Sequence, residues 1–150
     1  MRLWRIASAR FPALDGEGAR LYGGRWNSIG LPAVYTSRHA SLAVLEKLVW
    51  TDPEDVPDDF VLYGIDVPDD APIERLDRAL LPADWTESGA AACVRLGDGW
   101  LTSARSLALV VQSAVLGVED NVLLNPRHPM MSLVRVATRE PFTFDLRLIE

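Results

Sequence analysis

Three side chains that could do chemistry lie in the first third of the chain. Arg25 lies in the glycine-rich stretch GGRWN, Tyr35 in the short apolar run AVYTS, and Glu46 in the segment ASLAVLEKLVW. An arginine flanked by glycines can hold a phosphate or a carboxylate through paired hydrogen bonds, because glycine permits unusual backbone conformations. Arg25 could equally be an ordinary surface cation, and GGRWN is not a GxGxxG fingerprint.

Glu46 is unusual because a helix over residues 39–50 would place its carboxylate on an apolar face. On a helical wheel Glu46 falls between Leu42 and Trp50. Burying a carboxylate without partners costs on the order of several kcal/mol, so something must meet it. Three interpretations stay open. Glu46 forms a buried ion pair with an arginine, or the helix is partly exposed at this position. The third is that Glu46 faces a ligand in a cleft, where it could stabilise a developing positive charge or bind a sugar hydroxyl.

Tyr35 has two interpretations: a core residue of a strand, or a flat face for an aromatic ring if it lines the same cleft. Ser113, after the apolar run LALVVQ, is either a strand terminator or a hydrogen-bond donor in a pocket wall. Asn125 and His128 belong to the rigid turn NPRHP. The sequence has no Ser-His-Asp order, P-loop or metal-ligand cluster, which argues against the common hydrolases and kinases.

Composition limits the class of protein. The 150 residues, 49% of them hydrophobic, fit one compact domain, and a net charge of −6 argues against binding to a phosphate backbone. Lys47 is the one lysine among fifteen basic residues, an arginine bias that fits a GC-rich genome. The single Cys93 excludes an internal disulfide and, with no secretion signal and no membrane-length apolar run, predicts a cytoplasmic protein.

These side chains must be positioned by a small set of elements. Strand patterns predict a mostly antiparallel α+β domain with a few helices. The expected strands cover residues 2–7, 33–37, 60–67, 107–112 and 121–124, with a closing hairpin of 134–138 and 141–148. The expected helices cover 39–50, with Ser37 as N-cap, and 86–95, broken at the GDG sequence and extended by 101–103; residues 8–32 and 68–85 are expected to be loops, the latter with a short helical turn.

In their order and spacing these motifs resemble the RES domain, the toxin half of a bacterial toxin–antitoxin pair named for its Arg, Glu and Ser. The resemblance covers nearly all of residues 1–150, from RLWRIA through GGRWNSIGLPAVYTS, ASLAVLE and the region around NPRHP to FTFDLRL. The family residues match Arg25, Tyr35, Glu46 and Ser113, and its NP-x-H turn matches Asn125 and His128. Gln112 stands where the family usually has proline, a change that bears on the turn presenting Ser113.

The resemblance implies a fold like that of the diphtheria-toxin-type ADP-ribosyltransferases, with NAD as substrate and no metal. Arg25 would hold the dinucleotide through its phosphates or the nicotinamide-side ribose, and Tyr35 would stack on or orient the nicotinamide. Glu46 would stabilise the oxocarbenium-like ribose, and Ser113 would bind the ribose or the carboxamide. Asn125 and His128 are counted with the NAD-binding residues.

The function so implied is cleavage of the nicotinamide–ribose bond of NAD by water or phosphate, which depletes NAD and inhibits growth. The alternatives are a protein ADP-ribosyltransferase toxin, or a non-enzymatic binding module in which Arg25 and Glu46 form a structural ion pair. The implied partner is an Xre-like helical antitoxin that carries the DNA-binding function in an oligomeric complex. The chain itself is expected to bind neither nucleic acid nor membrane.

Overall fold

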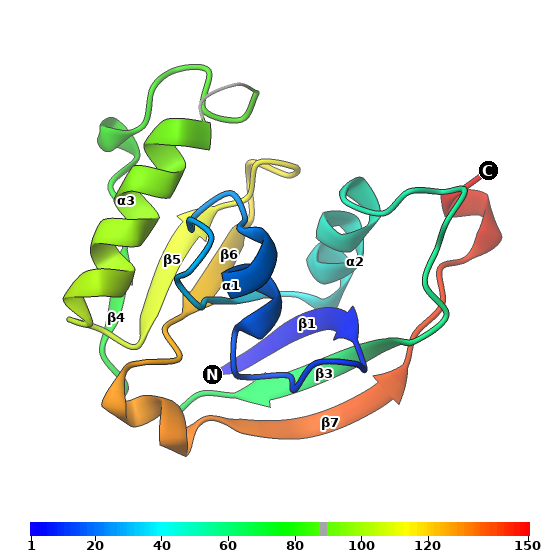
Figure 1. Cartoon of the computed structure of the whole chain (residues 1–150), viewed down its shortest axis with the longest axis horizontal. Helices are drawn as coiled ribbons and strands as arrows, with labels where there is room; N and C mark the ends of the chain where they lie inside the picture. The colour runs from blue at the N-terminus through cyan, green and yellow to red at the C-terminus, as the bar shows by residue number, and fades with distance from the viewer. Residues whose placement is uncertain (88–89) are drawn as a thin grey trace.

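A seven-stranded sheet forms the centre of the structure, a computed structural model that describes residues 1–87 and 90–150 (Figure 1). The strand order is β4-β5-β6-β2-β1-β3-β7, and the pairs are antiparallel except β4 with β5. The strands are β1 (Arg2–Ser8), β2 (Val34–Ser37), β3 (Phe60–Asp66), β4 (Ile73–Arg75), β5 (Ala108–Gln112), β6 (Asp120–Leu124) and β7 (Arg135–Pro141). The helices are α1 (Glu17–Tyr22), α2 (Ala40–Val49) and α3 (Ala90–Ser103), with the 3-10 turns η1 (Arg78–Leu80), η2 (Pro129–Leu133) and η3 (Leu146–Leu148).

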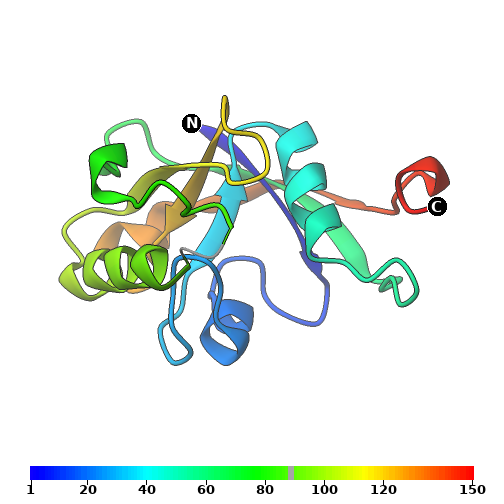
Figure 2. The ribbon, with the colours of Figure 1, turned by 90° about the horizontal axis from the view of Figure 1, so that it is seen from above.

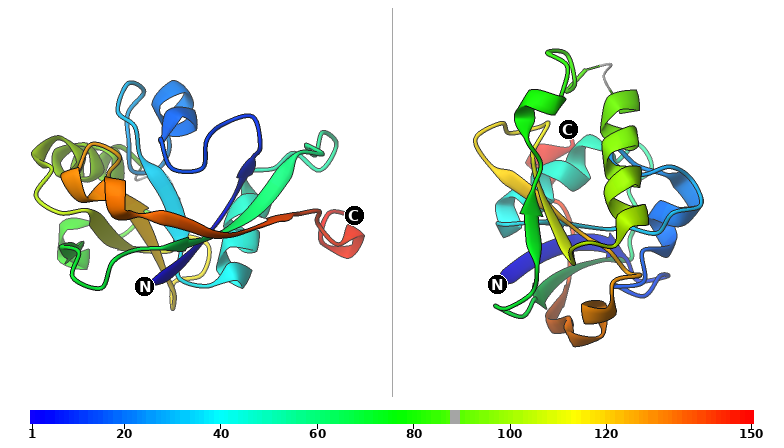
Figure 3. Two further views of the ribbon diagram at one scale, coloured as in Figure 1. Left: turned by 90° about the horizontal axis from the view of Figure 1, so that it is seen from below. Right: turned by 90° about the vertical axis from the view of Figure 1, so that its left-hand side faces the viewer.

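The sheet changes direction between β1 and β2. These two strands pair at one position, Trp4 with Ser37, whereas β1 pairs with β3 along its whole length. The strands of the two halves therefore run in different directions (Figures 2 and 3). Apolar side chains of both halves, such as Leu3 and Tyr63 on one side and Val122 on the other, share one buried core, against which methionines of η2 pack.

The opposite face of the sheet carries the helices. α2 packs on β1 and β2, and α3 lies toward the β4–β5 edge, with α1 between them in projection (Figure 1). The core beneath α3 combines Leu109 and Val111 of β5 with Trp100 of the helix. The glycine-rich loop after α1 contributes Trp26 to the same core. A region between α2 and α3 is thus bordered by helix, loop and sheet.

Several sequence predictions are confirmed. β1, β2, β3, β5, β6 and α2 lie where strands and a helix were expected, and the mostly antiparallel α+β class is correct. Two elements were missed because neither has a strong periodic pattern: α1, six residues with no buried side chain, and β4, three residues at the sheet edge. The helical turn expected in 68–85 is η1.

The predicted closing hairpin is wrong. Arg135–Pro141 is one strand paired with β3, and the chain then leaves the ladder after the Phe142 N–H bonds to the Phe60 carbonyl at 2.9 Å. Phe142 and Phe144 pack edge to face, and Phe144 packs on Phe60 in the same way. The alternation in FTFDLRL therefore reflects packing of aromatic rings and not a second paired strand.

Ser37 is not the N-cap of α2. The cap position is His39, whose side chain makes no capping hydrogen bond, while the Ser37 hydroxyl donates to Asn121 Oδ1 at 2.7 Å. Ser37 ends β2 opposite Asn121, so its hydroxyl is directed across the sheet rather than along the chain. Cross-strand pairing overrides the local capping preference.

The expected helix break at GDG is also wrong, since α3 runs through Gly97, Asp98 and Gly99 to Ser103. The start of the predicted helix includes residues 88–89, which lie outside the described residues. Gly97 is required by close packing, because a Cβ there would overlap the backbone carbonyl of Trp26. Gly99 has no neighbour within 4 Å of the corresponding position.

Gly97→Ala is expected to lower the free energy of unfolding by about 2 kcal/mol or more, because the helix must move away from the Trp26 backbone. Gly99→Ala, two residues along the same helix, is the matched control and should raise it by about 0.5–1 kcal/mol through helix propensity. Urea unfolding followed by circular dichroism measures both. Similar effects of the two substitutions would disprove the close approach at Gly97.

Candidate functional site

The glycine-rich loop is a tight turn that presents Arg25 and Trp26. Gly23 ends α1 with a φ of +72°, and the backbones of Gly24 and Asn27 exchange hydrogen bonds of 3.1 and 3.4 Å across the two residues between them. Trp26 is buried and packs against Trp85, with ring centroids 5.9 Å apart. Trp26 therefore anchors the loop in the core beneath α3.

A single buried amide organises the loop. Asn27, 1% exposed, donates from Nδ2 to the carbonyls of Ala19, Ser28 and Leu31 at 2.9, 3.2 and 3.0 Å. Its Oδ1 accepts from the Tyr35 hydroxyl at 2.5 Å. The link from Asn27 to Tyr35 joins the loop to β2.

Tyr35 joins this loop to the sheet. Its hydroxyl donates to Asn27 and accepts from the Trp26 N–H at 3.0 Å. Burial raises the pKa of Tyr35 well above its ordinary value, so the hydroxyl stays protonated and keeps both hydrogen bonds. The tyrosine ring is half-buried beside the tryptophan core.

Arg25 is anchored to backbone carbonyls. Its Nη1 donates to the Trp85 carbonyl at 2.9 Å and its Nη2 to the Thr86 carbonyl at 3.5 Å, with the guanidinium 5.8 Å from the Trp85 ring centre. Among residues 1–87 and 90–150, no carboxylate forms an ion pair with Arg25. The positive charge of Arg25 is held in place by neutral groups and can still attract an anion.

Glu46 meets two neutral donors. Its Oε1 accepts from Ser113 Oγ at 2.7 Å and from Asn121 Nδ2 at 2.6 Å. The ion pair of Glu46 with an arginine, and with Arg25 in particular, is wrong for the part of the chain that the structure describes. Both hydrogen bonds go to Oε1, and within that same part of the chain Oε2 accepts none.

The donors of Glu46 are themselves held. Asn121 accepts from the Ser37 hydroxyl, which orients the Asn121 amide with its NH₂ group toward Glu46. Ser113, 1% exposed, accepts from the backbone N–H groups of Val115 and Leu116 at 3.1 and 3.0 Å, which leaves its proton for Glu46. The sequence analysis did not identify Asn121 as a site residue, although Asn121 is the first residue of the predicted strand 121–124.

Gln112, the departure from the family pattern, supports the turn after β5. Its Nε2 donates to the Gly117 carbonyl at 2.6 Å, and the next backbone N–H, of Ser113, bonds to the Glu119 carbonyl at 2.9 Å. Gln112 thus closes the loop that presents the serine hydroxyl.

The sheet register brings the loop and the carboxylate to one face. Tyr35 pairs with Leu123 and Ser37 with Asn121 along β2 and β6, and paired residues point to the same face. Tyr35 and Asn121 are therefore diagonal neighbours, about 7–8 Å apart. Tyr35 and the Asn121–Glu46–Ser113 network therefore lie on the same face of the sheet. A common cleft that joins Arg25 to Glu46 stays a prediction.

Asn125 and His128 are used within the fold. The Asn125 amide donates to the Leu101 carbonyl at 3.0 Å and accepts from the Arg127 N–H, while His128 Nδ1 accepts from the Met130 N–H at the start of η2. They follow the far end of β6 from Asn121. Contact of these two side chains with NAD stays a prediction.

Arg5 is a further charged residue that the sequence analysis did not single out. Its Nη1 donates to the Tyr35 carbonyl at 3.1 Å, and its buried Nε has no partner among the described residues. The sequence pattern of β1 could have identified Arg5, because this residue alternates with Leu3 and Ala7, which are buried. A cation on the apolar face of a strand is the counterpart of Glu46 on the apolar face of a helix.

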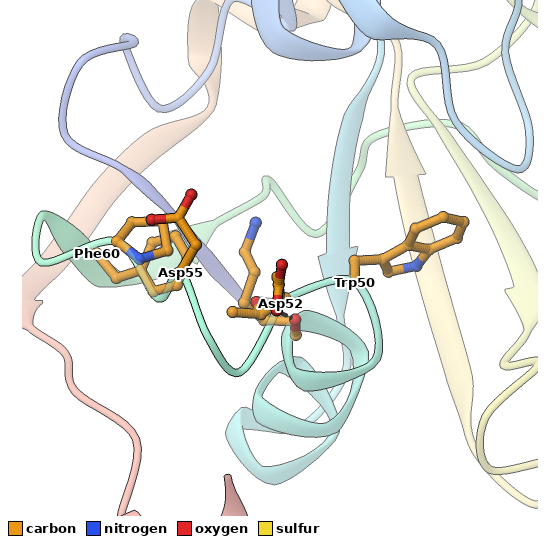
Figure 4. Close-up of a pocket in the computed structure, with 7 residues that line it drawn as sticks. Trp50, Asp52, Asp55 and Phe60 are labelled. Atoms are coloured by element: carbon orange, nitrogen blue, oxygen red, sulfur yellow. Dashed lines mark hydrogen bonds between the residues drawn. The ribbon is translucent and has the colours of Figure 1, made fainter.

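Two hollows in the surface have measurable volumes. One of about 490 Å³ runs along β7 and includes none of the candidate residues; it is lined by Val136, Ala137, Thr138 and Arg139. The other, of about 180 Å³, lies at the C-terminal end of α2 (Figure 4); it is lined by Lys47, Trp50, Thr51, Asp52, Asp55, Pro57 and Phe60. The hydrogen-bonded network around Glu46, and not cavity size, defines the candidate site.

Over the ranges 1–87 and 90–150, no group of three or more His, Cys, Asp or Glu side chains is arranged to hold a metal ion. No helix in this part of the chain is long and apolar enough to cross a bilayer.

The fold matches that of a chain in a solved toxin–antitoxin complex. The structure superposes on a chain of the M. tuberculosis MbcT–MbcA toxin–antitoxin complex with a TM-score of 0.74 and 21% identity, covering 95% of this chain and 84% of that one. The predicted α+β class with a mostly antiparallel sheet is confirmed, and the fold is shared with this chain of the complex.

Sequence comparison identifies the family within this class. The RES domain matches residues 2–145. The chain is 39% identical to Toxin Res of Photorhabdus laumondii, covering 100% of this chain and 98% of that protein. It is 34% identical to the Prs ADP-ribosylating toxin of a Sphingobium species, covering 97% and 95%. The chain belongs to the RES domain family.

Tyr35→Phe is expected to lower the free energy of unfolding by about 1–3 kcal/mol, because it leaves Asn27 Oδ1 and the Trp26 N–H without their buried partner. Tyr22→Phe is the matched control, since Tyr22 is 74% exposed. It should change the free energy by less than about 0.5 kcal/mol. Urea unfolding measures both, and equal stability of the two variants would contradict a structural role of the Tyr35 hydroxyl.

Proposed function

We propose that this protein is the toxin of a toxin–antitoxin pair and that it cleaves the nicotinamide–ribose bond of NAD. The observation that carries the proposal is the Glu46 carboxylate, fixed through Oε1 by Ser113 and Asn121, while Oε2 accepts no hydrogen bond from the described residues. Family membership and the relatives named Toxin Res and Prs ADP-ribosylating toxin support the same reading. The RES domain is proposed to fill residues 1–150.

The reaction fits a fixed carboxylate. Nicotinamide is bound to ribose as a cationic pyridinium, so when the C–N bond breaks both electrons go to nitrogen and a neutral ring leaves. The positive charge remains on the ribose as an oxocarbenium-like species, which a carboxylate stabilises. Water then adds and loses a proton to give ADP-ribose, or phosphate adds to give a phosphorylated ADP-ribose. No general acid is needed for the leaving group.

The other side chains have separate tasks in this proposal. Arg25 attracts the phosphates or the nicotinamide-side ribose, and the Tyr35 ring orients the nicotinamide. Ser113 acts through Glu46, because its hydroxyl proton is already donated to the carboxylate. This differs from the direct ribose or carboxamide contact that the resemblance implied for Ser113.

Transfer of ADP-ribose to a protein is the second candidate, favoured by the name of the Sphingobium relative. The two reactions share the same bond cleavage and differ in the acceptor. The non-enzymatic binding module assumed an ion pair between Arg25 and Glu46. Among the described residues, Arg25 bonds instead to a backbone carbonyl, and Glu46 accepts from neutral side chains.

An antitoxin partner is proposed because the solved neighbour is a toxin–antitoxin complex. An Xre-like helical antitoxin would supply the DNA-binding surface that a chain of net charge −6 does not offer. The oligomeric complex would act in the cytoplasm.

Incubation of the purified protein with NAD, with and without phosphate, followed by mass spectrometry, tests the proposal. Free nicotinamide with ADP-ribose indicates hydrolysis, and phosphorylated ADP-ribose indicates phosphorolysis. A mass increase on an added protein indicates transfer. Absence of nicotinamide release in all three conditions would refute the proposed reaction.

Glu46→Gln is expected to lower kcat for nicotinamide release by about 10²–10³-fold, because the amide keeps the shape but not the charge that stabilises the ribose cation. Glu54→Gln, an exposed position just after the same helix, is the control and should leave kcat unchanged. Steady-state kinetics measure both, with melting temperatures to confirm folding. Full activity of Glu46→Gln would exclude this residue from the chemistry.

Asn121→Ala is expected to lower kcat about tenfold with a smaller change in KM, because one of two donors that orient Glu46 is lost. Asn121→Ala with Ser113→Ala should lower kcat further, since the carboxylate is then free to rotate. Kinetics of the single and double variants measure the coupling. An unchanged kcat in the double variant would show that these donors do not position Glu46.

A further inference from the structure

One carboxylate of α3 holds the Arg25 loop, residues 23–32, against the helix. Asp98 accepts through Oδ1 from the Ser28 N–H at 2.8 Å and through Oδ2 from the Ser28 hydroxyl. Within residues 1–87 and 90–150, Asp98 forms no ion pair. Both carboxylate oxygens therefore serve one loop residue, three positions after Arg25, through hydrogen bonds that the negative charge strengthens.

The preceding residue of α3, Gly97, lets the loop come this close. A Cβ at Gly97 would overlap the Trp26 carbonyl oxygen, so the helix touches the backbone of the loop itself. Trp100, on the next turn of α3, lies in the core in which Trp26 is buried. The GDG sequence is thus the part of α3 that receives the Arg25 loop, since the glycine leaves room and the aspartate supplies the hydrogen bonds.

The loop needs an anchor because glycines lie on both sides of Arg25. Gly23 has a φ of +72° and Gly30 a φ of +104°, and glycine changes its backbone conformation at low cost. Asn27 ties the loop to α1 and to β2, whereas the link between Ser28 and Asp98 ties it to α3. The position of the Arg25 backbone relative to α3 therefore depends on this link.

The guanidinium of Arg25 depends on the same placement. It donates to the carbonyls of Trp85 and Thr86 at 2.9 and 3.5 Å, and both residues belong to the segment that precedes α3. The bond to Thr86 is already long, so a small shift of the loop would break it. The backbone near Arg25 and its side chain are thus held by the same part of the molecule.

We propose that Asp98 is a positioning residue of the candidate site, which fixes Arg25 for its substrate by holding Ser28 against α3. This inference rests on the proposed function for the task of Arg25, whereas the link between Asp98 and Ser28 is independent of it. Asp98 acts through the loop and not by contact with substrate. Its loss should weaken the binding of NAD and leave the bond-breaking step, which depends on Glu46, almost unchanged.

Hydrogen exchange of single amides, followed by NMR, tests the link itself. In Asp98→Ala the Ser28 amide loses its acceptor and should exchange at least tenfold faster. Asp98→Asn keeps one oxygen for the Ser28 N–H and should show a smaller increase. The Gly23 amide, bonded to the Ala19 carbonyl at the end of α1, is the internal control and should be unchanged. Unchanged exchange at Ser28 would overturn the proposal.

Steady-state kinetics test the positioning role. Asp98→Ala should raise KM for NAD about tenfold with kcat within twofold, and Asp98→Asn should recover part of the loss. A merely structural role would lower the folded fraction, and with it kcat, without changing KM. Asp70→Ala removes an exposed carboxylate between β3 and β4 and should change neither constant. A fall in kcat at unchanged KM in Asp98→Ala would overturn the positioning role.

A double variant tests whether Asp98 acts through Arg25. Once Arg25→Met has removed the guanidinium, the addition of Asp98→Ala should change KM by less than twofold, because the two residues form one unit. A further tenfold rise would contradict action through Arg25. If the wild type releases no nicotinamide, the proposed function fails, and the exchange rate at Ser28 still decides whether Asp98 holds the Arg25 loop.

Discussion

The structure depends on how one carboxylate on an apolar helix face is accommodated. Glu46 is partly buried, and two neutral donors at the ends of neighbouring strands, Ser113 and Asn121, bond to its Oε1. The hydrogen bonds tie α2 to β5 and β6, although the helix packs mainly on β1. Because the donors are neutral, the carboxylate keeps its negative charge uncompensated, which suits a site that must stabilise a cation.

The Asn27 amide is a second buried polar group, and it holds the glycine-rich loop together. The loop 23–32 has little regular backbone structure, and its carbonyls would be unsatisfied in the core without the Asn27 amide. The same amide accepts from the Tyr35 hydroxyl, so hydrogen bonds join the tyrosine directly to the turn that carries Arg25. The two networks meet on one face of the sheet through the pairing of β2 with β6.

The elements with strong local patterns could be predicted from the sequence. Alternating apolar residues identified β1 and β3, and helical periodicity identified α2. Elements without such patterns could not: β4 is three residues long and exists because it pairs with β5. The helix break predicted at GDG was wrong for the same reason. Gly97 allows close approach of the Trp26 backbone, a contact that is distant in the chain and cannot be inferred from local sequence.

Residue types and spacing were enough to identify the side chains that could act: Arg25 between glycines, Glu46 on an apolar helix face, and their match to the RES family. Their contacts follow from the folded structure. The donors of Glu46 lie 67 and 75 residues away, and the partner of Arg25 lies 60 residues away. Periodicity reports burial within a few turns of chain, whereas the choice between an ion pair and neutral donors depends on which strands meet. The same reason hid Arg5, whose bond to the Tyr35 carbonyl exists only because β1 and β2 lie side by side in the sheet.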